Sequence, residues 1–219
     1  KIYKNFNERD HFILSKGHAA PALYSVLYNL GMIKKKELLS FRDIGTKLQG
    51  HPDRTKLKYV ELGTGALGQG LSVSIGFALA NIILKKNKKS FCLVGDGEIQ
   101  EGQIWEAAMY AGSNNLNNLC LILDNNKMQN ETYTKQTLDV MPLKEKWEAF
   151  KWNVIDINGH SYTQIDKAFK KFYLEKKKPT IIIANTIKGK GISFMEDSAT
   201  WHSKVLDEKN YHLAKKELI

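Results

Sequence analysis

The stretch that decides the fold lies at residues 91–127 and reads FCLVGDGEIQEGQIWEAAMYAGSNNLNNLCLILDNNK. Two apolar runs in it, 91–94 and 119–123, have the length of buried strands. The first run ends in Gly-Asp-Gly at 95–97, and the second ends in Asp-Asn-Asn at 124–126. Parallel strands of one sheet end on the same edge, so we expect these oxygen-bearing side chains to lie close together.

The rest of the chain alternates in the same way between apolar runs and segments with helical periodicity. The predicted strands are 91–94, 119–123, 153–157 and 180–186, and the predicted helices are 18–30, 36–42, 71–84, 102–112, 143–150, 162–175 and 206–218. Apolar strands separated by helices predict an α/β fold, a parallel sheet with helices on both faces. The sequence shows no internal repeat or linker, and we expect a single domain over residues 1–219.

Composition narrows the classes of function. The chain carries 33 Lys and Arg against 23 Asp and Glu, a net charge of +10. The lysines cluster at helix ends and in turns, without the aromatic interleaving or the motifs typical of nucleic-acid binders. No apolar run reaches the ~20 residues of a membrane span, and no signal peptide is recognisable, so we expect no nucleic-acid or membrane partner. Cys92 and Cys120 lie within apolar runs and suit a reducing cytoplasm as small buried side chains.

The acid in the Gly-Asp-Gly turn has two explanations. Asp96 follows a buried strand, where an acid is usually a helix N-cap. Its neighbours Gly95 and Gly97 also permit the close backbone approach that a loop around phosphate requires. Mg²⁺ takes oxygen ligands, commonly one or two carboxylates together with substrate phosphates. Asp96, the later Asn126 and a backbone carbonyl just beyond it therefore predict the protein's share of a metal–diphosphate site.

Further motifs accompany this pair in a characteristic order. They are SKGH at 15–18, GHPD at 50–53, GTGALGQG at 63–70, GDGEIQEG at 95–102, KGKG at 188–191 and WH at 201–202. Gly-Asp-Gly followed by Asn-Asn across one helix and one strand resembles the thiamine diphosphate motif, and the whole series resembles transketolase from about Asp10 to Leu206. The resemblance implies the thiamine diphosphate-binding (PP-domain) fold. It also implies thiamine diphosphate and Mg²⁺, or Ca²⁺ or Mn²⁺, as cofactors.

The resemblance further implies roles for individual residues. The residues expected at the metal are Asp96, Asn126 and Met128, the last through its carbonyl. The residues expected at the cofactor are Gly65, Leu67, Gly95, Gly97, Asn126, His18 and His202. The residues expected to be catalytic are His18, His51, Glu101, Lys188 and His202, with Gln129 as a further active-site neighbour.

The residues themselves leave simpler explanations open for several of these positions. A loop histidine is commonly a surface residue, and Lys188 also fits a solvated loop lysine. Glu101 is also a favourable acid for the first turn of a helix, and Gly65 suits a turn that enters a helix. Three histidines at motif positions favour a site, because imidazole donates or accepts protons near neutral pH. His202 is followed by Ser203 where many family members have glycine, a departure that affects the path of that loop.

The resemblance covers only the diphosphate-binding half of transketolase. The pyrimidine-binding half is absent, and the first segment of the family would lie upstream of Lys1. This implies the N-terminal subunit of a split transketolase, which moves a two-carbon ketol unit from a ketose phosphate to an aldose phosphate. We expect a heterotetramer with a C-terminal, pyrimidine-binding partner chain, and no activity of this chain alone.

Three other functions compete with this hypothesis. A related thiamine-dependent transferase of the deoxyxylulose-phosphate synthase type is disfavoured by the GHPD and WH motifs. A non-catalytic scaffold subunit is disfavoured because Asp96, Asn126 and the three motif histidines are all in place. A Rossmann-type dehydrogenase is disfavoured because no G-x-G-x-x-G follows the first strand with an acid ~20 residues later.

Overall fold

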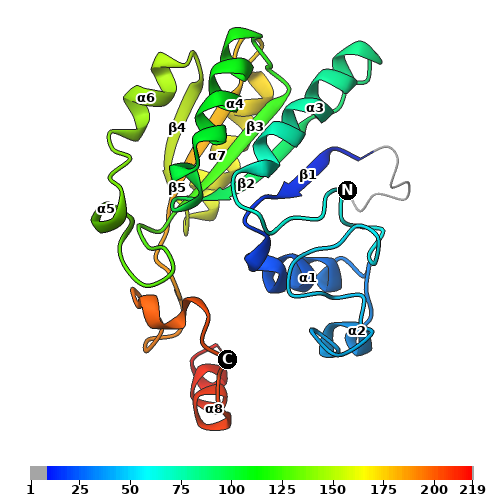
Figure 1. The fold of residues 1–219 in the computed structure, drawn as a ribbon, viewed down its shortest axis with the longest axis vertical. Helices are drawn as coiled ribbons and strands as arrows, with labels where there is room; N and C mark the ends of the chain where they lie inside the picture. Colours follow the sequence, from blue (N-terminus) through cyan, green and yellow to red (C-terminus); the bar gives the residue numbers. More distant parts are fainter. Residues whose placement is uncertain (1–8, 219) are drawn as a thin grey trace.

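The structure is a computed structural model of the chain, and it describes residues 9–218 (Figure 1). The strands are β1 (His11–Leu14), β2 (Ser90–Gly95), β3 (Leu119–Asn125), β4 (Asn153–Asn158) and β5 (Thr180–Asn185). The α-helices are α1 (Ala20–Asn29), α2 (Lys35–Leu39), α3 (Gln69–Ile83), α4 (Gly102–Ser113), α5 (Thr134–Thr137), α6 (Leu143–Ala149), α7 (Tyr162–Leu174) and α8 (Glu208–Glu217). Short 3-10 turns are η2 (Gly17–Ala19), η3 (Glu98–Gln100) and η4 (Ala199–His202).

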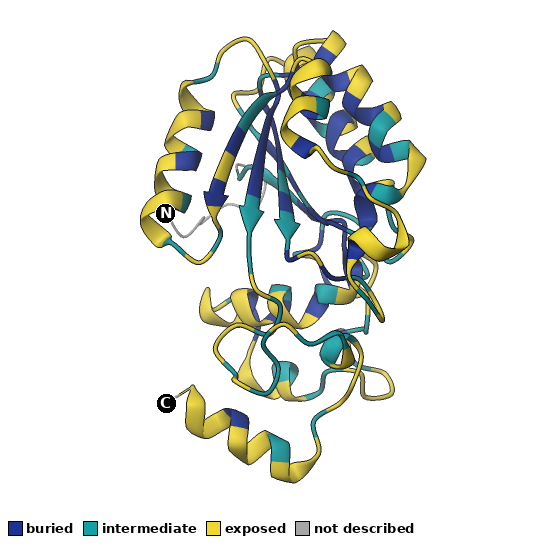
Figure 2. Cartoon of the chain, turned by 90° about the vertical axis from the view of Figure 1, so that its left-hand side faces the viewer, coloured by how far each residue is buried: buried dark blue, intermediate teal, exposed yellow. Residues whose placement is uncertain are grey.

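The five strands form one parallel sheet in the order β1-β2-β3-β5-β4. In this register Gly95, at the end of β2, lies opposite Asp124 near the end of β3. The strands point toward the half of the molecule that carries the C-terminal helix α8 (Figure 2). The predicted α/β fold with a parallel sheet is confirmed, and the two polar turns do lie on neighbouring strands.

Strand β1 is an element that the sequence analysis does not predict. It spans only four residues, too few to show a clear periodicity, and it forms one edge of the sheet beside β2. Ile13 and Leu14 are buried, and the side chain of Asp10 accepts a hydrogen bond from the Lys89 amide at 2.8 Å just before β2 begins. Because β1 ends at the same edge as β2, it places the SKGH motif beside the Gly-Asp-Gly turn.

Helices cover both faces of the sheet, as predicted (Figure 2). On one face α3, α4 and α6 pack on the strands through residues such as Leu71, Ile104 and Trp147. On the other face α7 packs through Phe172. Burial from both sides explains why β2, β3 and β5 are apolar along most of their length, whereas the edge strand β4 alternates between buried and exposed residues.

Both cysteines are free and buried in this core, as the sequence predicts. Burial raises the pKa of the Cys92 thiol to about 12 and also raises the pKa of Cys120. Both thiols are therefore protonated near pH 7 and are poor nucleophiles and metal ligands. Within residues 9–218, no helix combines the length and the apolar character that crossing a membrane requires.

A third apolar cluster lies beyond the ends of the strands and is built on α1 and the loops that follow α2. Tyr24 of α1 is buried and donates a hydrogen bond from its hydroxyl to the Gln49 carbonyl at 2.9 Å. This bond fixes the segment that leads into the GHPD motif. Helix α1 begins at Ala20, not at residue 18, because the 3-10 turn η2 precedes it. His18 therefore belongs to a turn at the edge of the sheet.

Candidate functional site

Asp96 lies in the turn after β2, and its side chain is almost completely buried, with 2% exposure. Its carboxylate accepts hydrogen bonds from the Gly97 amide, at 2.8 Å, and from the Lys127 amide. The bond to Lys127 joins the turn after β2 to the turn after β3. Burial raises the pKa of Asp96 to about 6 and outweighs the lowering by the two hydrogen bonds. A nearby cation would stabilise the ionised form of a buried carboxylate of this kind.

The other two predicted metal residues flank Lys127 in the turn after β3. The side-chain oxygen of Asn126 accepts a hydrogen bond from the Met128 amide at 3.0 Å. The side-chain nitrogen of Asn126 donates to the Asp124 carboxylate at 3.2 Å. The structure thus brings Asp96, Asn126 and Met128 together, and their role as metal ligands stays a prediction.

Asp124 is a partly buried carboxylate, with 29% of its side chain exposed, to which the sequence analysis assigns no role. It receives the Lys16 ammonium at 2.8 Å and the hydroxyl of Thr186, in addition to the Asn126 amide. Burial by itself raises the pKa of Asp124, but the Lys16 charge and these hydrogen bonds outweigh it and lower the pKa below its ordinary value. Asp124 is therefore ionised near pH 7 and ties together the ends of β1, β3 and β5.

Two of the predicted histidines and the predicted lysine meet at the same edge. The rings of His18 and His202 have centroids 5.1 Å apart, and the Lys188 ammonium lies 2.9 Å from Nδ1 of His202. His18 is exposed as a residue, but partial burial of its ring lowers its pKa to about 4, with Lys16 and His202 adding to the shift. Burial and the Lys188 charge lower the pKa of His202. Both rings are therefore neutral near pH 7, while the ammonium groups of Lys16 and Lys188 supply positive charge that would attract an anion.

The third predicted histidine lies against the glycine-rich loop 63–70. A Cβ built on Gly65 would come within 3.1 Å of the His51 ring, so the loop backbone and the ring are in close contact. His51 also lies near enough to His18 to contribute to its lowered pKa. A Cβ on Gly17 would lie 2.7 Å from the backbone of Thr64, which only glycine can accommodate. The three motif histidines thus lie around one region of the edge.

Leu67 and Glu101 are brought together around Gly68. Gly68 has a φ of 83°, and a Cβ built on it would lie 2.9 Å from Cβ of Glu101. The Gln103 amide donates to the Leu67 carbonyl at 3.5 Å. Glu101 itself is exposed, and within the described part of the chain its side chain forms no hydrogen bond or ion pair.

A second residue that the sequence analysis overlooks is Glu98, directly after the Gly-Asp-Gly turn. It is 2% exposed, and burial raises the pKa of its carboxyl group against the hydrogen bonds that lower it. The carboxylate accepts hydrogen bonds from the Ser15 hydroxyl, the Gly68 amide and the Gly95 amide. Glu98 and Asp124 both stand within residues 91–127, but spacing alone does not show which acids are enclosed by hydrogen-bond donors.

The residues at this edge fit a divalent cation with a diphosphate. Asp96, Asn126 and Met128 offer a carboxylate, an amide oxygen and a carbonyl, which are donors that Mg²⁺ accepts. Within residues 9–218, no three His, Cys, Asp or Glu side chains gather into a metal-binding group, so a cation here would depend on the amide, the carbonyl and the diphosphate oxygens. A Cβ on Gly97 would lie 2.9 Å from Cβ of Gln129, which shows how tightly the two turns approach.

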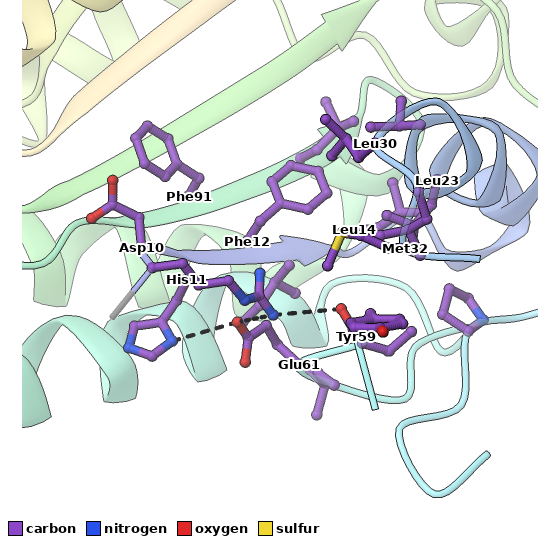
Figure 3. A pocket seen from close by; sticks show the side chains of 18 of the residues that line it. Asp10, His11, Phe12, Leu14, Leu23, Leu30, Met32, Tyr59, Glu61 and Phe91 are labelled. Carbon is purple, nitrogen blue, oxygen red and sulfur yellow. Dashed lines mark hydrogen bonds and ion pairs between the residues drawn. The ribbon is translucent and has the colours of Figure 1, made fainter. Parts of the chain in front are cut away.

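Two cavities of the structure lie apart from the Asp96 turn. An apolar cavity of about 950 Å³ is lined by Phe12, Phe91 and Leu30, among others, and contains none of the predicted site residues (Figure 3). A smaller, polar cavity of about 520 Å³ is lined by His51 and Arg42 together with residues of the glycine-rich loop. Of these two cavities, the second adjoins the predicted site.

A parallel sheet whose neighbouring strands end in hydrogen-bonded Gly-Asp-Gly and Asn-Asn turns belongs to the class of thiamine diphosphate-binding α/β domains. Residues 3–218 match the family described as "Transketolase, thiamine diphosphate binding domain". The chain belongs to this family.

Known proteins similar to the chain include proteins named as transketolase subunits and proteins named as transketolases. It is 41% identical over 211 residues to the 6-deoxy-6-sulfo-D-fructose transketolase subunit SqwG of Clostridium sp. (strain MSTE9), covering 96% of this chain and 77% of that protein. It is 38% identical to a subunit of the apulose-4-phosphate transketolase of Phocaeicola vulgatus, covering 96% of this chain and 75% of the relative. The crystal structure of transketolase from Campylobacter jejuni superposes with a TM-score of 0.92 at 36% identity, over 98% of this chain and 35% of that one. The chain thus spans about three quarters of the two subunits and about a third of the Campylobacter enzyme.

Proposed function

We propose that this chain is the diphosphate-binding part of a transketolase assembled from two kinds of subunit. The enzyme would move a two-carbon ketol unit from a ketose to an aldose. The observation that carries the proposal is the hydrogen bond from the Lys127 amide to Asp96. It joins the Gly-Asp-Gly turn to the turn of Asn126 and Met128, beside a cluster of histidines and lysines.

The chain's own part in this reaction begins with holding the cofactor. Asp96, Asn126 and the Met128 carbonyl would bind Mg²⁺, and the Gly97 turn would approach the diphosphate. Lys188, with the neutral His18 and His202, would face the anionic end of the cofactor. Thiamine diphosphate, when bound, supplies the carbon nucleophile that takes the ketol unit from the ketose.

The histidines would handle the substrate's protons. His18 and His202 have lowered pKa values, so each ring is neutral near pH 7 and can accept or donate a proton. Lys188 as an ammonium donates and cannot accept, so Nδ1 of His202, 2.9 Å away, would be the acceptor. The proton of the neutral ring would then be on Nε2, where it could be donated to a substrate oxygen. His51, against the glycine-rich loop, would hold the ketol oxygens.

The substrate is proposed to be a sugar that carries an anionic group. The two subunit relatives are named for 6-deoxy-6-sulfo-D-fructose and apulose-4-phosphate, which carry a sulfonate and a phosphate. The net charge of +10 on this chain suits attraction of such substrates. We propose an anionic ketose as donor and a phosphorylated aldose as acceptor, without choosing among individual sugars.

The partner is proposed to be a pyrimidine-binding subunit, in a heterotetramer. Two of the relatives are named as subunits, and Glu101 is exposed beside Gly68, at the rim where a partner's residue would meet the cofactor. Glu101 would pass protons to and from that partner residue. This chain alone would then lack activity.

The proposal is tested by reconstitution with the partner encoded in the same cell. We expect the mixture, with Mg²⁺ and thiamine diphosphate, to transfer the ketol unit from sugar phosphates or sulfo-sugars, and each chain alone to be inactive. His51→Ala should lower kcat/KM by at least about 100-fold and leave cofactor affinity unchanged, because the ring serves the substrate. The matched control is His212→Ala, which changes an exposed histidine of α8.

Other outcomes would contradict the proposal. Release of carbon dioxide from pyruvate in place of ketol transfer would favour a thiamine-dependent transferase of the deoxyxylulose-phosphate synthase type. A stable complex that binds no thiamine diphosphate would favour a scaffold subunit. Full activity of His51→Ala would remove His51 from the site.

A further inference from the structure

Glu98 connects three segments of the site through one buried carboxylate. Oε1 accepts hydrogen bonds from the Ser15 hydroxyl and from the Gly68 amide at 2.9 Å, and Oε2 accepts one from the Gly95 amide at 3.1 Å. The Ser15 oxygen in turn accepts a hydrogen bond from the Gly70 amide at 3.1 Å. Only 2% of Glu98 is exposed, so these protein groups take the place of water around the carboxylate.

Each of the three segments carries a residue of the proposed site. Ser15 begins the SKGH motif that contains His18, and Gly68 follows Leu67 in the glycine-rich loop. Gly95 directly precedes Asp96. The segments come from the ends of β1 and β2 and from the start of α3, and the carboxylate lies where they meet.

The packing around Glu98 leaves little freedom to these segments. A Cβ on Gly70 would lie 2.4 Å from Ser15, and a Cβ on Gly17 would lie 2.7 Å from the Thr64 backbone. The Thr64 hydroxyl also donates to the Leu14 carbonyl at 2.7 Å. The glycine-rich loop and the end of β1 thus touch along their length, and Glu98 joins both to the Gly-Asp-Gly turn.

We propose that Glu98 is a positioning residue that fixes these three segments relative to one another before the cofactor binds. The inference rests on the proposed function for the identity of the cofactor. A site whose loops are already ordered loses less conformational entropy on binding, so the effect falls on affinity. Glu98 itself does not touch substrate, and turnover of the fully loaded enzyme should depend on it only weakly.

Glu98→Gln isolates this role because it keeps the shape of the side chain. Glutamine has one acceptor oxygen and one amino group, so at least one of the three donors then faces another donor. In the complex formed with Mg²⁺ and the partner chain, we expect the Kd of thiamine diphosphate to rise by at least about tenfold. At saturating cofactor we expect kcat to stay within about twofold of wild type, since the chemistry uses other groups.

Glu175→Gln is the matched control. Glu175 also accepts hydrogen bonds from backbone amides, those of Lys177 at 2.7 Å and Lys178 at 3.3 Å, but it lies between α7 and the start of β5. That end of the sheet is opposite to the proposed site. This variant should leave the Kd of thiamine diphosphate unchanged.

A second measurement needs no cofactor. Amide hydrogen exchange in the wild-type chain and in Glu98→Gln should differ at Gly68, Gly70 and Gly95, which should exchange at least about tenfold faster in the variant. Amides of the core strands should keep their protection. If Glu98→Gln does not fold, Ser15→Ala removes one donor and keeps the carboxylate, and it should show a smaller change at the same amides.

The results separate the inference from the proposed function. A raised Kd with selective exchange at the three glycines supports the inference. An unchanged Kd, or faster exchange spread evenly over the core, overturns it and leaves the proposed function intact. A wild-type complex that binds no thiamine diphosphate contradicts the proposed function and the cofactor role of Glu98 together.

Discussion

At the scale of single residues, the site combines buried and partly buried carboxylates with neutral histidines and ammonium groups. Asp96, Glu98 and Asp124 are each held by hydrogen bonds from backbone or side-chain donors. Lys16 is paired with Asp124, so its charge is anchored at the edge of the sheet. Charges and dipoles that are fixed in advance need no reorganisation when an anion and a cation arrive.

The protonation of His18 is a direct test of this environment. Its pKa is lowered to about 4 by burial and by neighbours that include Lys16. In a titration followed by nuclear magnetic resonance, the His18 ring should stay neutral from pH 8 to below pH 6. A midpoint at or above 6.5 would show that the ring is fully solvated in the free chain.

The same shift predicts how stability depends on pH. The unfolded chain binds a proton at His18 below pH 6.5, and the folded chain does so only near pH 4, so acidification across this window lowers the free energy of unfolding. Comparing wild type with His18→Gln by thermal unfolding at several pH values isolates the contribution. The difference in the free energy of unfolding should be constant above pH 6.5. Below that pH the wild type should lose stability relative to the variant.

The sequence predicts the members of the site better than it predicts what holds them. Asp96 and Asn126 are predicted because strand ends meet at one edge, and the structure does bring them together through Lys127. The roles of Glu98 and Asp124 are not predicted, because the groups that donate hydrogen bonds to them, such as Ser15 and Lys16, are distant in sequence.

At the scale of elements, length decides what can be predicted. Helices such as α3 and α7 span several turns and show their periodicity, and their existence is predicted. Strand β1 and helix α5 span four residues each, and neither is predicted. The strand is recognised only from its pairing with β2, which is a contact between residues about eighty positions apart.

Two glycines in helices test how tightly the elements pack. A Cβ on Gly112 of α4 would lie 1.7 Å from the Phe150 carbonyl oxygen, whereas a Cβ on Gly76 of α3 meets nothing within 4 Å. Gly112→Ala should destabilise the chain by ~1–3 kcal/mol through overpacking. Gly76→Ala should stabilise it by up to about 1 kcal/mol through helix propensity. Denaturant unfolding measures both, and equal effects would contradict the packing of α4 on the segment after α6.

At the scale of the whole molecule, the helix that begins at the site exposes two large apolar side chains. Met109 and Tyr110 of α4 are each 47% exposed, on the helix that begins directly after Glu101. We expect the proposed partner subunit to cover these side chains, because α4 begins at Glu101, at the rim where the partner would complete the site.

Charge substitution on α4 tests this contact. Met109→Glu should raise the Kd for the partner by at least about tenfold, as loss of a buried interface residue does. The control is Leu174→Glu, at the far end of α7, where an equally apolar side chain is 76% exposed. Analytical ultracentrifugation of the mixed subunits gives both values. Equal weakening by the two variants, or none by Met109→Glu, would place the interface elsewhere.

The central claim is that one cation joins Asp96 and Asn126 to the diphosphate of the cofactor. The most direct measurement replaces Mg²⁺ by Mn²⁺ in the assembled complex and records hyperfine coupling between the bound Mn²⁺ and phosphorus. The account predicts phosphorus coupling in wild type and in the control Asp166→Asn, an exposed acid of α7, and loss of Mn²⁺ binding by at least about 100-fold in Asp96→Asn. Bound Mn²⁺ without phosphorus coupling, or coupling unchanged in Asp96→Asn, would contradict it.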